Sequence, residues 1–334
     1  MKSSVIVTGA AGFIGSALVW LLNNRGRGDI LCVDQLGSDA KWKNLNGLAF
    51  SDYVEKSSFI AALEKHGLKK FGRISAVLHM GANSSTTERD VSSLVANNFE
   101  YTKTLCSAAL SANSRFVYAS SAATYGDGSA GYSDGEAGLD SLRPLNPYGW
   151  SKQAFDLWAR KRGLLGRIAG LKYFNVYGPN EYHKGEMRSM VLKAWEQITQ
   201  TGRLKLFRSH RPDYRDGEQK RDFLYVKDAA DATLFFLDKP GANGLFNIGT
   251  GTAETWNSLA SAVFKAMGKP LAVDYIDMPE ALRGQYQYFT RAETARLGAA
   301  GHPGARFGLD EGVSDYVANY LVPGGRYLEK EPVK

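Results

Sequence analysis

A tyrosine and a lysine four residues apart could couple proton transfer to the oxidation of a hydroxyl group. Tyr148 and Lys152 lie in a segment whose spacing of apolar residues predicts a helix over 147–161. Residues i and i+4 share one face of a helix, so the ammonium is expected near the phenol. A nearby positive charge favours the phenolate and would lower the tyrosine pKa from its ordinary value of about 10. We therefore expect Tyr148 to act as an acid–base group, assisted by Lys152.

A glycine-rich loop near the N-terminus predicts where a cofactor would bind. Gly9, Gly12 and Gly15 follow a short apolar run and precede a helix expected over 13–24. In a strand–loop–helix unit, glycines let the backbone approach a pyrophosphate, and the helix N-terminus offers amide donors. Glycines also serve ordinary turns, so this loop alone is a weak signal. Followed by the Tyr-x-x-x-Lys pair, it indicates a redox enzyme with a dinucleotide cofactor.

Four further residues bear on the cofactor and the reaction. Asp34 ends the second expected strand, where a carboxylate commonly binds the adenosine ribose hydroxyls of NAD. Lys41 and Lys56 could instead bind the 2′-phosphate of NADP, so these residues leave both cofactors open. Ser121 follows an apolar run and is expected to hydrogen-bond the reacting oxygen.

Strand-like and helical patterns alternate over the first half of the chain. The expected strands are 4–8, 30–34, 76–79, 116–119 and 168–174, and the expected helices are 13–24, 92–111 and 147–161. This alternation predicts an α/β fold, a Rossmann doubly wound parallel sheet with a smaller α/β C-terminal substrate domain. The expected division is 1–174 plus about 223–250 for the cofactor domain, about 175–222 plus 251–322 for the substrate domain, and a frayed tail over 323–334.

Composition limits the class of protein. The 334 residues are 44% hydrophobic and 22% charged, which is ordinary for a globular protein. No apolar run approaches the roughly 20 residues of a membrane helix, and no signal peptide is recognised. Cys32 and Cys106 are expected to be reduced core thiols, so we expect a cytoplasmic protein with no membrane partner. No residues have metal-ligand spacing, so no metal is expected.

The net charge of +7 is uneven, because basic residues crowd the stretch 203–221. No nucleic-acid fold motif accompanies them, so nucleic acid is not the expected partner. Guanidinium groups match phosphate oxygens well. A ligand that carries a diphosphate is therefore expected.

Four runs of residues resemble a known family. They are Ser-Ser-Thr-Thr-Glu at 84–88, Tyr-Ala-Ser-Ser-Ala-Ala-Thr-Tyr-Gly at 118–126, Lys-Tyr-Phe-Asn-Val-Tyr-Gly-Pro-Asn-Glu-Tyr-His-Lys-Gly at 172–185, and Lys-Arg-Asp-Phe at 220–223. Over nearly its whole length the chain resembles the extended short-chain dehydrogenase/reductases of the NAD-dependent epimerase/dehydratase family, which modify nucleotide sugars. Within them it is most similar to the epimerases that act on carbon 6 of an ADP-linked heptose.

This resemblance implies an isomerase that converts ADP-D-glycero-D-manno-heptose to its L-glycero epimer, for the heptose supply of the lipopolysaccharide core. Carbon 6 would be oxidised to a ketone and reduced again with bound NADP; NAD is the less favoured alternative. Lys184 would be a second base opposite Tyr148, although without the resemblance it reads as a surface lysine. A homo-oligomer, possibly a pentamer, is also implied.

The same match assigns further site residues. The implied cofactor-binding residues are Gly9, Gly12, Phe13, Ile14, Gly15, Asp34, Gln35, Lys41, Lys56, Met80, Gly81, Ala82, Asn83, Ser84, Asn97, Tyr148, Lys152 and Val176. The implied substrate-binding residues are Ser85, Asn175, Lys184, Glu186, Lys193, Phe207, Arg221 and Tyr286. Met80, Glu186 and Gln285 depart from the family pattern, which leaves the exact sugar open.

Two alternatives stay open. One is another nucleotide-sugar epimerase or dehydratase that acts on a UDP-, GDP- or dTDP-sugar. Ser121 is followed by Ala-Ala-Thr, which lacks the acidic residues that a 4,6-dehydratase would use to expel water. The other is a non-catalytic dinucleotide-binding protein, but such proteins commonly lose the tyrosine or the lysine, and both are present here.

Overall fold

A parallel sheet forms the centre of the molecule. The computed structural model describes residues 4–284 and 286–330. Its largest sheet has seven strands in the order β11-β6-β5-β4-β1-β2-β3, and every pairing in it is parallel. The strands are β1 (Ser4–Thr8), β2 (Ile30–Asp34), β3 (Asp52–Glu55), β4 (Ile74–His79), β5 (Arg115–Ser121), β6 (Ala169–Tyr173) and β11 (Gly244–Ile248). The strand order reverses between β1 and β4, as in a doubly wound sheet, so the predicted Rossmann fold is confirmed.

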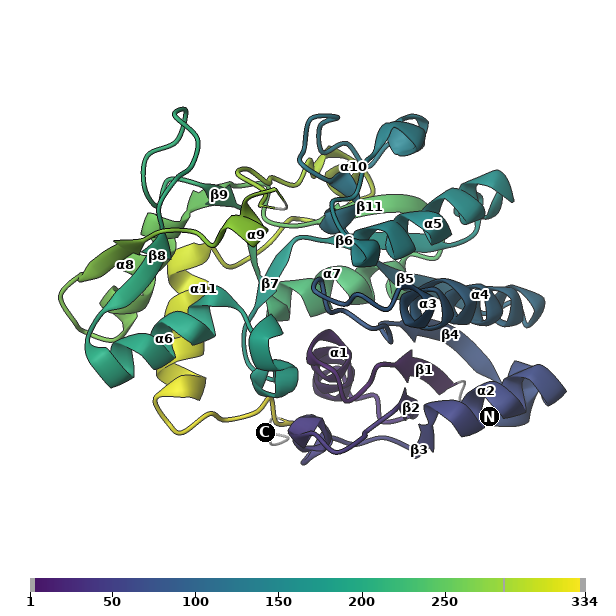
Figure 1. Cartoon of the computed structure of the whole chain (residues 1–334). Helices are drawn as coiled ribbons and strands as arrows, with labels where there is room; N and C mark the ends of the chain where they lie inside the picture. Colours follow the sequence, from purple (N-terminus) through teal and green to yellow (C-terminus); the bar gives the residue numbers. More distant parts are fainter. Residues whose placement is uncertain (1–3, 285, 331–334) are drawn as a thin grey trace.

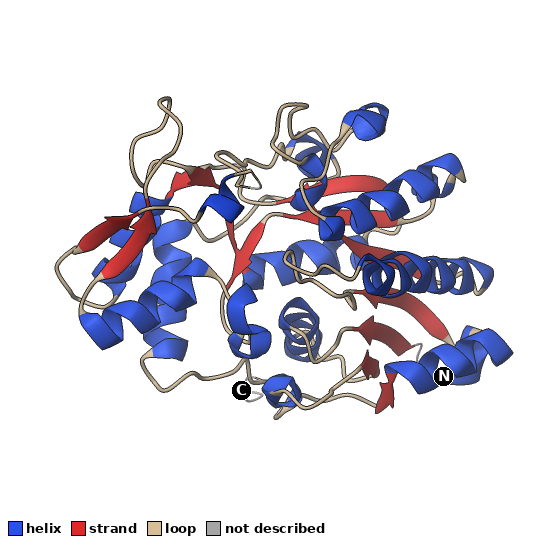
Figure 2. Cartoon of the chain, in the orientation of Figure 1, coloured by secondary structure: helices blue, strands red, loops and turns tan. Residues whose placement is uncertain are grey.

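Helices cover both faces of this sheet (Figures 1 and 2). They are α1 (Phe13–Asn24), α2 (Lys56–His66), α3 (Val91–Leu94), α4 (Tyr101–Ser111), α5 (Pro147–Lys161) and α7 (Val226–Asp238). Strand β1 shows how alternate side chains serve the two faces. Val5 and Val7 pack in one apolar cluster with Leu18 of α1, whereas Ile6 packs in a second cluster with Leu105 of α4 and Phe155 of α5. The sheet is thus buried on both sides, as continuous apolar strands predict.

The predicted helix over 92–111 is one continuous helical segment with an irregularity. A π-helical turn at Val95–Glu100 joins α3 to α4. Such turns shift the helical register by one residue and are not visible in apolar spacing.

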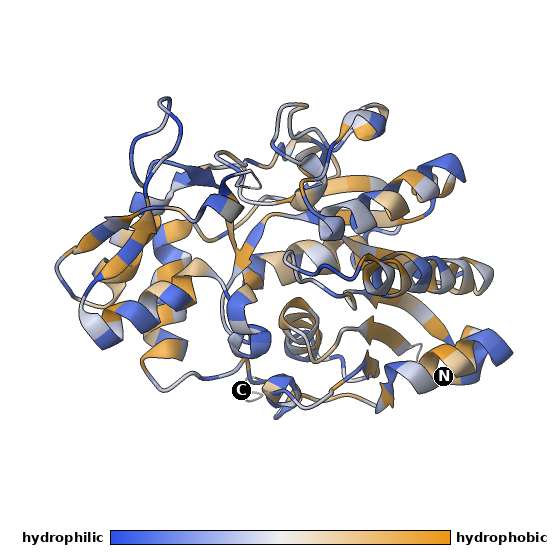
Figure 3. Ribbon diagram, viewed as in Figure 1, coloured by the Kyte–Doolittle hydropathy of each residue, from blue (hydrophilic) through white to orange (hydrophobic). Residues whose placement is uncertain are grey.

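A second group of elements lies at the left of Figure 1. Short strand pairs are formed by β7 (Asn175–Tyr177) with β10 (Phe223–Tyr225), β8 (Leu204–Phe207) with β13 (Val273–Ile276), and β9 (Lys220–Arg221) with β12 (Glu254–Thr255). The helices here are α6 (Met190–Thr201), α8 (Trp256–Ala266), α9 (Glu280–Arg283) and α11 (Leu309–Tyr316), and α10 (Ala295–Ala299) packs near β11. In Figure 3 the loop between β8 and β9 is hydrophilic, whereas the strands beside it carry apolar positions.

The C-terminal segment corrects the prediction of a frayed tail. Leu328 is fully buried, and its backbone amide donates to the side-chain oxygen of Asn180 at 2.9 Å. The indole of Trp20, on α1, donates to the carbonyl of Glu329 at 3.0 Å. Up to residue 330 the tail is therefore anchored against α1. No helix in the described ranges is long and apolar enough to cross a membrane.

Candidate functional site

The glycine loop joins β1 to α1 at the carboxyl end of the sheet. Gly9 has a φ of +65°, and a Cβ on Gly15 would collide with the carbonyl oxygen of Gly9. Both positions therefore require glycine. Gly12 is the N-cap of α1 and supplies no capping side chain. The first amides of α1 are thus left for a ligand, which suits an anionic group such as a pyrophosphate.

Three cavities gather most of the predicted site residues. The main cavity, of about 640 Å³, is lined by Gly9, Gly12, Phe13, Ile14, Gly15, Asp34, Lys41, Met80, Gly81, Ala82, Asn83, Ser84, Ser85, Ser121, Tyr148, Lys152, Asn175, Val176 and Lys184. A second, which we call the lysine cavity, has about 320 Å³ and adds Gln35, Lys56 and Asn97. A third, the outer cavity, has about 600 Å³ and contains Lys193, Phe207 and Tyr286.

Two of the predicted substrate-binding residues lie outside these three cavities. Glu186 is exposed and forms an ion pair with Lys193 at 3.2 Å. Arg221 is buried, and its guanidinium lies 5.5 Å from the ring of Trp256 and 5.1 Å from that of Tyr286. Neither lines any of the three cavities described here. Gln285 lies outside the described residues.

The start of α5 places Tyr148 beside Ser121. Asn146 caps the helix by accepting a hydrogen bond from the amide of Gly149 at 2.8 Å. A Cβ on Gly149 would lie 2.6 Å from the carbonyl oxygen of Ala123, so the helix packs directly on the segment that follows Ser121. As a result, the Ser121 hydroxyl reaches the phenol of Tyr148 in a hydrogen bond.

The pKa of Tyr148 beside Lys152 differs from the prediction. Burial raises the pKa of Tyr148 above its ordinary value of 10, and the hydrogen bond with Ser121 opposes that rise. Burial lowers the pKa of Lys152 to about 8, partly offset by Asp156. The ammonium of Lys152 donates to the carbonyl of Ala119 at 2.8 Å. The prediction that Lys152 lowers the Tyr148 pKa is wrong in this structure, because the ammonium is turned to that carbonyl and burial dominates.

Lys184 faces the main cavity from the short 3-10 segment Tyr182–Met187. Its Nζ lies 5.1 Å from the ring of Phe13. Burial lowers the pKa of Lys184, and the nearby Glu181 opposes that shift. Glu181 is itself buried and accepts hydrogen bonds from the Gly178 amide at 3.1 Å and the Ser189 hydroxyl at 2.7 Å. The loop that carries Lys184 is therefore held at both ends.

Charged groups define the lysine cavity. The Asp34 carboxylate accepts from the amide of Ala11 at 2.8 Å and from the ammonium of Lys41 at 2.9 Å. Lys56 hydrogen-bonds Asn97, and its Nζ lies 4.8 Å from the ring of Tyr101. Burial lowers the pKa of Lys56, while Asp34 opposes the shift. Two ammonium groups and one carboxylate thus lie beside the glycine loop, and this donor set fits the ribose end of a dinucleotide.

Sequence reasoning missed Met190 and Trp256. Both line the main cavity and the outer cavity. Each is the first residue of a helix, α6 and α8, and apolar residues at such positions are ordinarily read as core. No signal in the sequence distinguished them.

Comparison with known proteins agrees with this geometry. The family model described as "NAD dependent epimerase/dehydratase family" matches residues 5–249. A protein of Nitratidesulfovibrio vulgaris named ADP-L-glycero-D-manno-heptose-6-epimerase is 53% identical to this chain, and the match covers 97% of this chain and 99% of that relative. A protein of Fusobacterium nucleatum with the same name is 45% identical, and the match covers 97% of this chain and 100% of that relative.

Solved structures give the same result. The ADP-L-glycero-D-manno-heptose-6-epimerase of Helicobacter pylori has a TM-score of 0.79 at 26% identity and covers 95% of this chain and 96% of its own. The UDP-glucose 4-epimerase of Thermus thermophilus, in complex with NAD, has a TM-score of 0.74 at 27% identity, with 94% and 97% covered. The chain therefore belongs to the NAD-dependent epimerase/dehydratase family, which works with a nicotinamide dinucleotide.

Proposed function

We propose that this chain epimerises carbon 6 of ADP-D-glycero-D-manno-heptose, the reaction implied by the names of its relatives at 53% and 45% identity. One observation carries the proposal: Tyr148 and Lys184 line one cavity together with the glycine loop. Inversion through a ketone needs proton transfer on either face of the reacting carbon, and this cavity offers a phenol and an amine from different segments.

The roles follow from the protonation of these groups. When bound in the main cavity, a nicotinamide dinucleotide would supply the hydride acceptor for the oxidation at carbon 6 and the hydride donor for its reduction. Burial lowers the Lys184 pKa, which favours a neutral amine able to accept the hydroxyl proton. Burial raises the Tyr148 pKa, which favours a neutral phenol able to donate a proton when the ketone is reduced. Ser121, which is hydrogen-bonded to Tyr148, would orient the oxygen of the substrate ketone.

We further propose that the cofactor is NADP. Lys41 and Lys56 both line the lysine cavity and could each donate to a 2′-phosphate. Asp34 already accepts from Lys41, which leaves this carboxylate less free to accept from a ribose 2′-hydroxyl. NAD is the alternative, and mass analysis of the nucleotide released by denaturing the purified protein would distinguish the two.

We also propose where the ADP group of the substrate binds. The outer cavity, with Lys193, Phe207 and Tyr286, would hold the ADP group, and segments 175–222 and 251–322 would form the substrate domain. Arg221 would act there by holding the rings of Tyr286 and Trp256 in place.

The test is to incubate the purified protein with ADP-D-glycero-D-manno-heptose, without added cofactor, and follow carbon 6 by NMR. Inversion is expected. Tyr148→Phe should reduce the rate about 10²–10⁴-fold because it removes the proton donor. Tyr275→Phe is the matched control, since its phenol donates to Asn257 at 2.9 Å and lines no part of the main cavity. No inversion of this sugar, together with inversion of another sugar nucleotide, would refute the proposal.

A further inference from the structure

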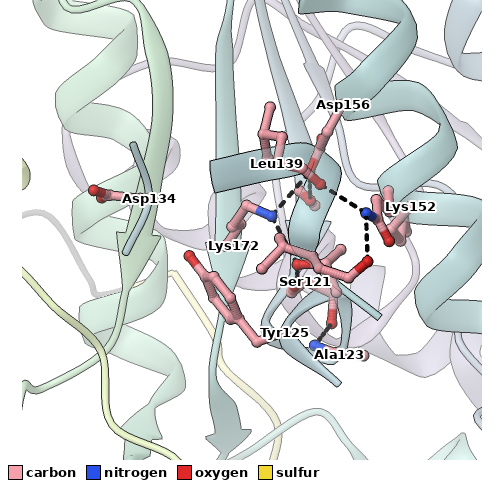
Figure 4. Close-up of polar contacts among 12 residues, drawn as sticks. Ser121, Ala123, Tyr125, Asp134, Leu139, Lys152, Asp156 and Lys172 are labelled. Atoms are coloured by element: carbon pink, nitrogen blue, oxygen red, sulfur yellow. Dashed lines mark hydrogen bonds and ion pairs between the residues drawn. The ribbon is translucent and has the colours of Figure 1, made fainter. Parts of the chain in front are cut away.

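A fully buried ion pair lies behind Lys152. The Nζ of Lys172, on β6, forms an ion pair with a carboxylate oxygen of Asp156 (Figure 4). The two atoms are 3.1 Å apart, and neither side chain has exposed surface. Asp156 follows Lys152 by four residues on α5, so the two share one face of the helix. Replacing a buried ion pair with apolar residues is often neutral or stabilising, so stability alone is a weak explanation for this one.

The pair is part of a closed hydrogen-bond network. One oxygen of Asp156 accepts from the Tyr118 hydroxyl at 2.8 Å, and the other accepts from the Ser120 hydroxyl at 2.7 Å. Lys172 also donates to the hydroxyl of Thr124 at 2.7 Å. Ser120 and Thr124 lie on either side of Ser121, which faces the main cavity. The network therefore fixes the segment that presents Ser121 to a substrate.

We propose that Asp156 and Lys172 are positioning residues for proton transfer: they fix the segment around Ser121, and the Asp156 carboxylate keeps Lys152 in its ammonium form. Asp156 touches neither of the proposed proton-transfer groups, so it acts through Lys152 and Ser120. The functional part of this inference depends on the proposed epimerase activity, whereas its electrostatic part can be measured without turnover.

The charges around Lys152 explain why this carboxylate matters. Burial lowers the Lys152 pKa to about 8, and the negative charge of Asp156 opposes that shift. Burial lowers the pKa of the His79 imidazole, on β4, and the positive charges of Lys152 and Lys56 lower it further, which keeps the ring neutral. Lys172 approaches from β6, and the phenol of Tyr148 lies on the same helix. Without Asp156, we expect Lys152 to lose its proton at a lower pH.

Competitive labelling of Lys152 with acetic anhydride, read by mass spectrometry across pH, measures this protonation directly. Asp156→Asn alone would leave the Lys172 ammonium unpaired in the interior, so the main variant is D156N/K172M. Its labelling midpoint should fall relative to the wild type, by less than the roughly one pH unit that loss of the Asp156 charge alone would give, because the variant also removes the Lys172 charge. Lys172→Met alone removes the opposing positive charge and leaves Asp156 with its Tyr118 and Ser120 donors. Its midpoint should therefore rise.

A chemically similar pair elsewhere serves as the control. Lys227 lies 2.7 Å from Asp315, which also accepts from the hydroxyl of Tyr225 at 2.6 Å. In D315N/K227M the Lys152 midpoint should equal that of the wild type.

Comparison of K172M with D156N/K172M distinguishes an electrostatic effect on Lys152 from a general loosening of the structure around it. A folded D156N/K172M protein with an unchanged midpoint would overturn the proposal, as would a fall of equal size in both K172M and the double variant. If the double variant does not fold, a K172M midpoint that is unchanged or lower still overturns it. A wild type that labels as expected but does not turn over ADP-heptose would refute the proposed function instead.

Discussion

Replacing Lys41 with methionine tests the proposed cofactor preference. In the structure Lys41 donates to Asp34 at 2.9 Å with only 18% of its side chain exposed, so it is already ordered beside the lysine cavity. A charge-assisted hydrogen bond contributes about 1.5–3 kcal/mol, and about 1.4 kcal/mol corresponds to a tenfold change in Kd. Loss of one such bond to a 2′-phosphate should therefore weaken NADP binding about 10–100-fold.

The effect on NAD should be different. Without Lys41, the Asp34 carboxylate keeps its bond from the amide of Ala11 and becomes free to accept from a ribose hydroxyl. NAD affinity should therefore stay the same or increase. Isothermal titration calorimetry with both cofactors on protein stripped of nucleotide measures the ratio. Lys43→Met is the matched control, because Lys43 lies with Lys41 on the short 3-10 helix Ala40–Leu45, is exposed and lines neither the main cavity nor the lysine cavity.

Equal weakening of NADP and NAD in Lys41→Met would refute the reasoning, because it would indicate general damage to the site. An unchanged Kd for NADP would refute it as well, since the ammonium would then make no contact with the phosphate.

Lys184→Met should reduce kcat about 10²–10⁴-fold with little change in KM, and the wild-type rate should rise with pH as the amine loses its proton; an unchanged kcat would exclude a role in proton transfer. Burial holds the His79 pKa well below 6.5, so the unfolded state binds more protons as pH falls below 6.5, and stability is lost there. The thermal midpoint should thus drop between pH 7 and pH 5, and less so in His79→Gln; equal drops in both would contradict this linkage. Leu328→Ala should cost about 2–5 kcal/mol of unfolding free energy in urea, whereas Leu271→Ala, 59% exposed, should change it by less than about 0.5 kcal/mol; a mild effect at Leu328 would mean that the tail is not anchored.

Sequence patterns predicted the elements that are buried or capped by local signals. Helix α5 begins at Pro147 after the cap Asn146, and both its bounds agree with the prediction. Strand β3 was missed because its four residues, Asp-Tyr-Val-Glu, are partly exposed at the sheet edge and carry no apolar run. The paired strands β8 and β13 are short and come from segments about 70 residues apart, so local spacing could not connect them.

The site was predictable to different degrees. The glycine loop and the Tyr-x-x-x-Lys pair have spacings that follow from helix geometry, and the structure brings both to the main cavity. The direction of the Tyr148 pKa shift was not predictable from the sequence. Burial of the phenol determines that shift, and a sequence pattern does not show how deeply one side-chain group is buried. The resemblance implied that Arg221 binds the substrate, but it could not predict that the guanidinium packs against the rings of Trp256 and Tyr286, which come from distant segments.

The shared wall of Met190 and Trp256 has a consequence for stereochemistry. Since both residues border the main cavity and the outer cavity, an ADP-sugar with its nucleotide in the outer cavity and its sugar in the main cavity would contact both side chains. A nucleotide bound in the outer cavity would hold the substrate in place while its oxidised sugar rotates in the main cavity. The oxidised carbon could then turn its opposite side toward the same nicotinamide without leaving the protein.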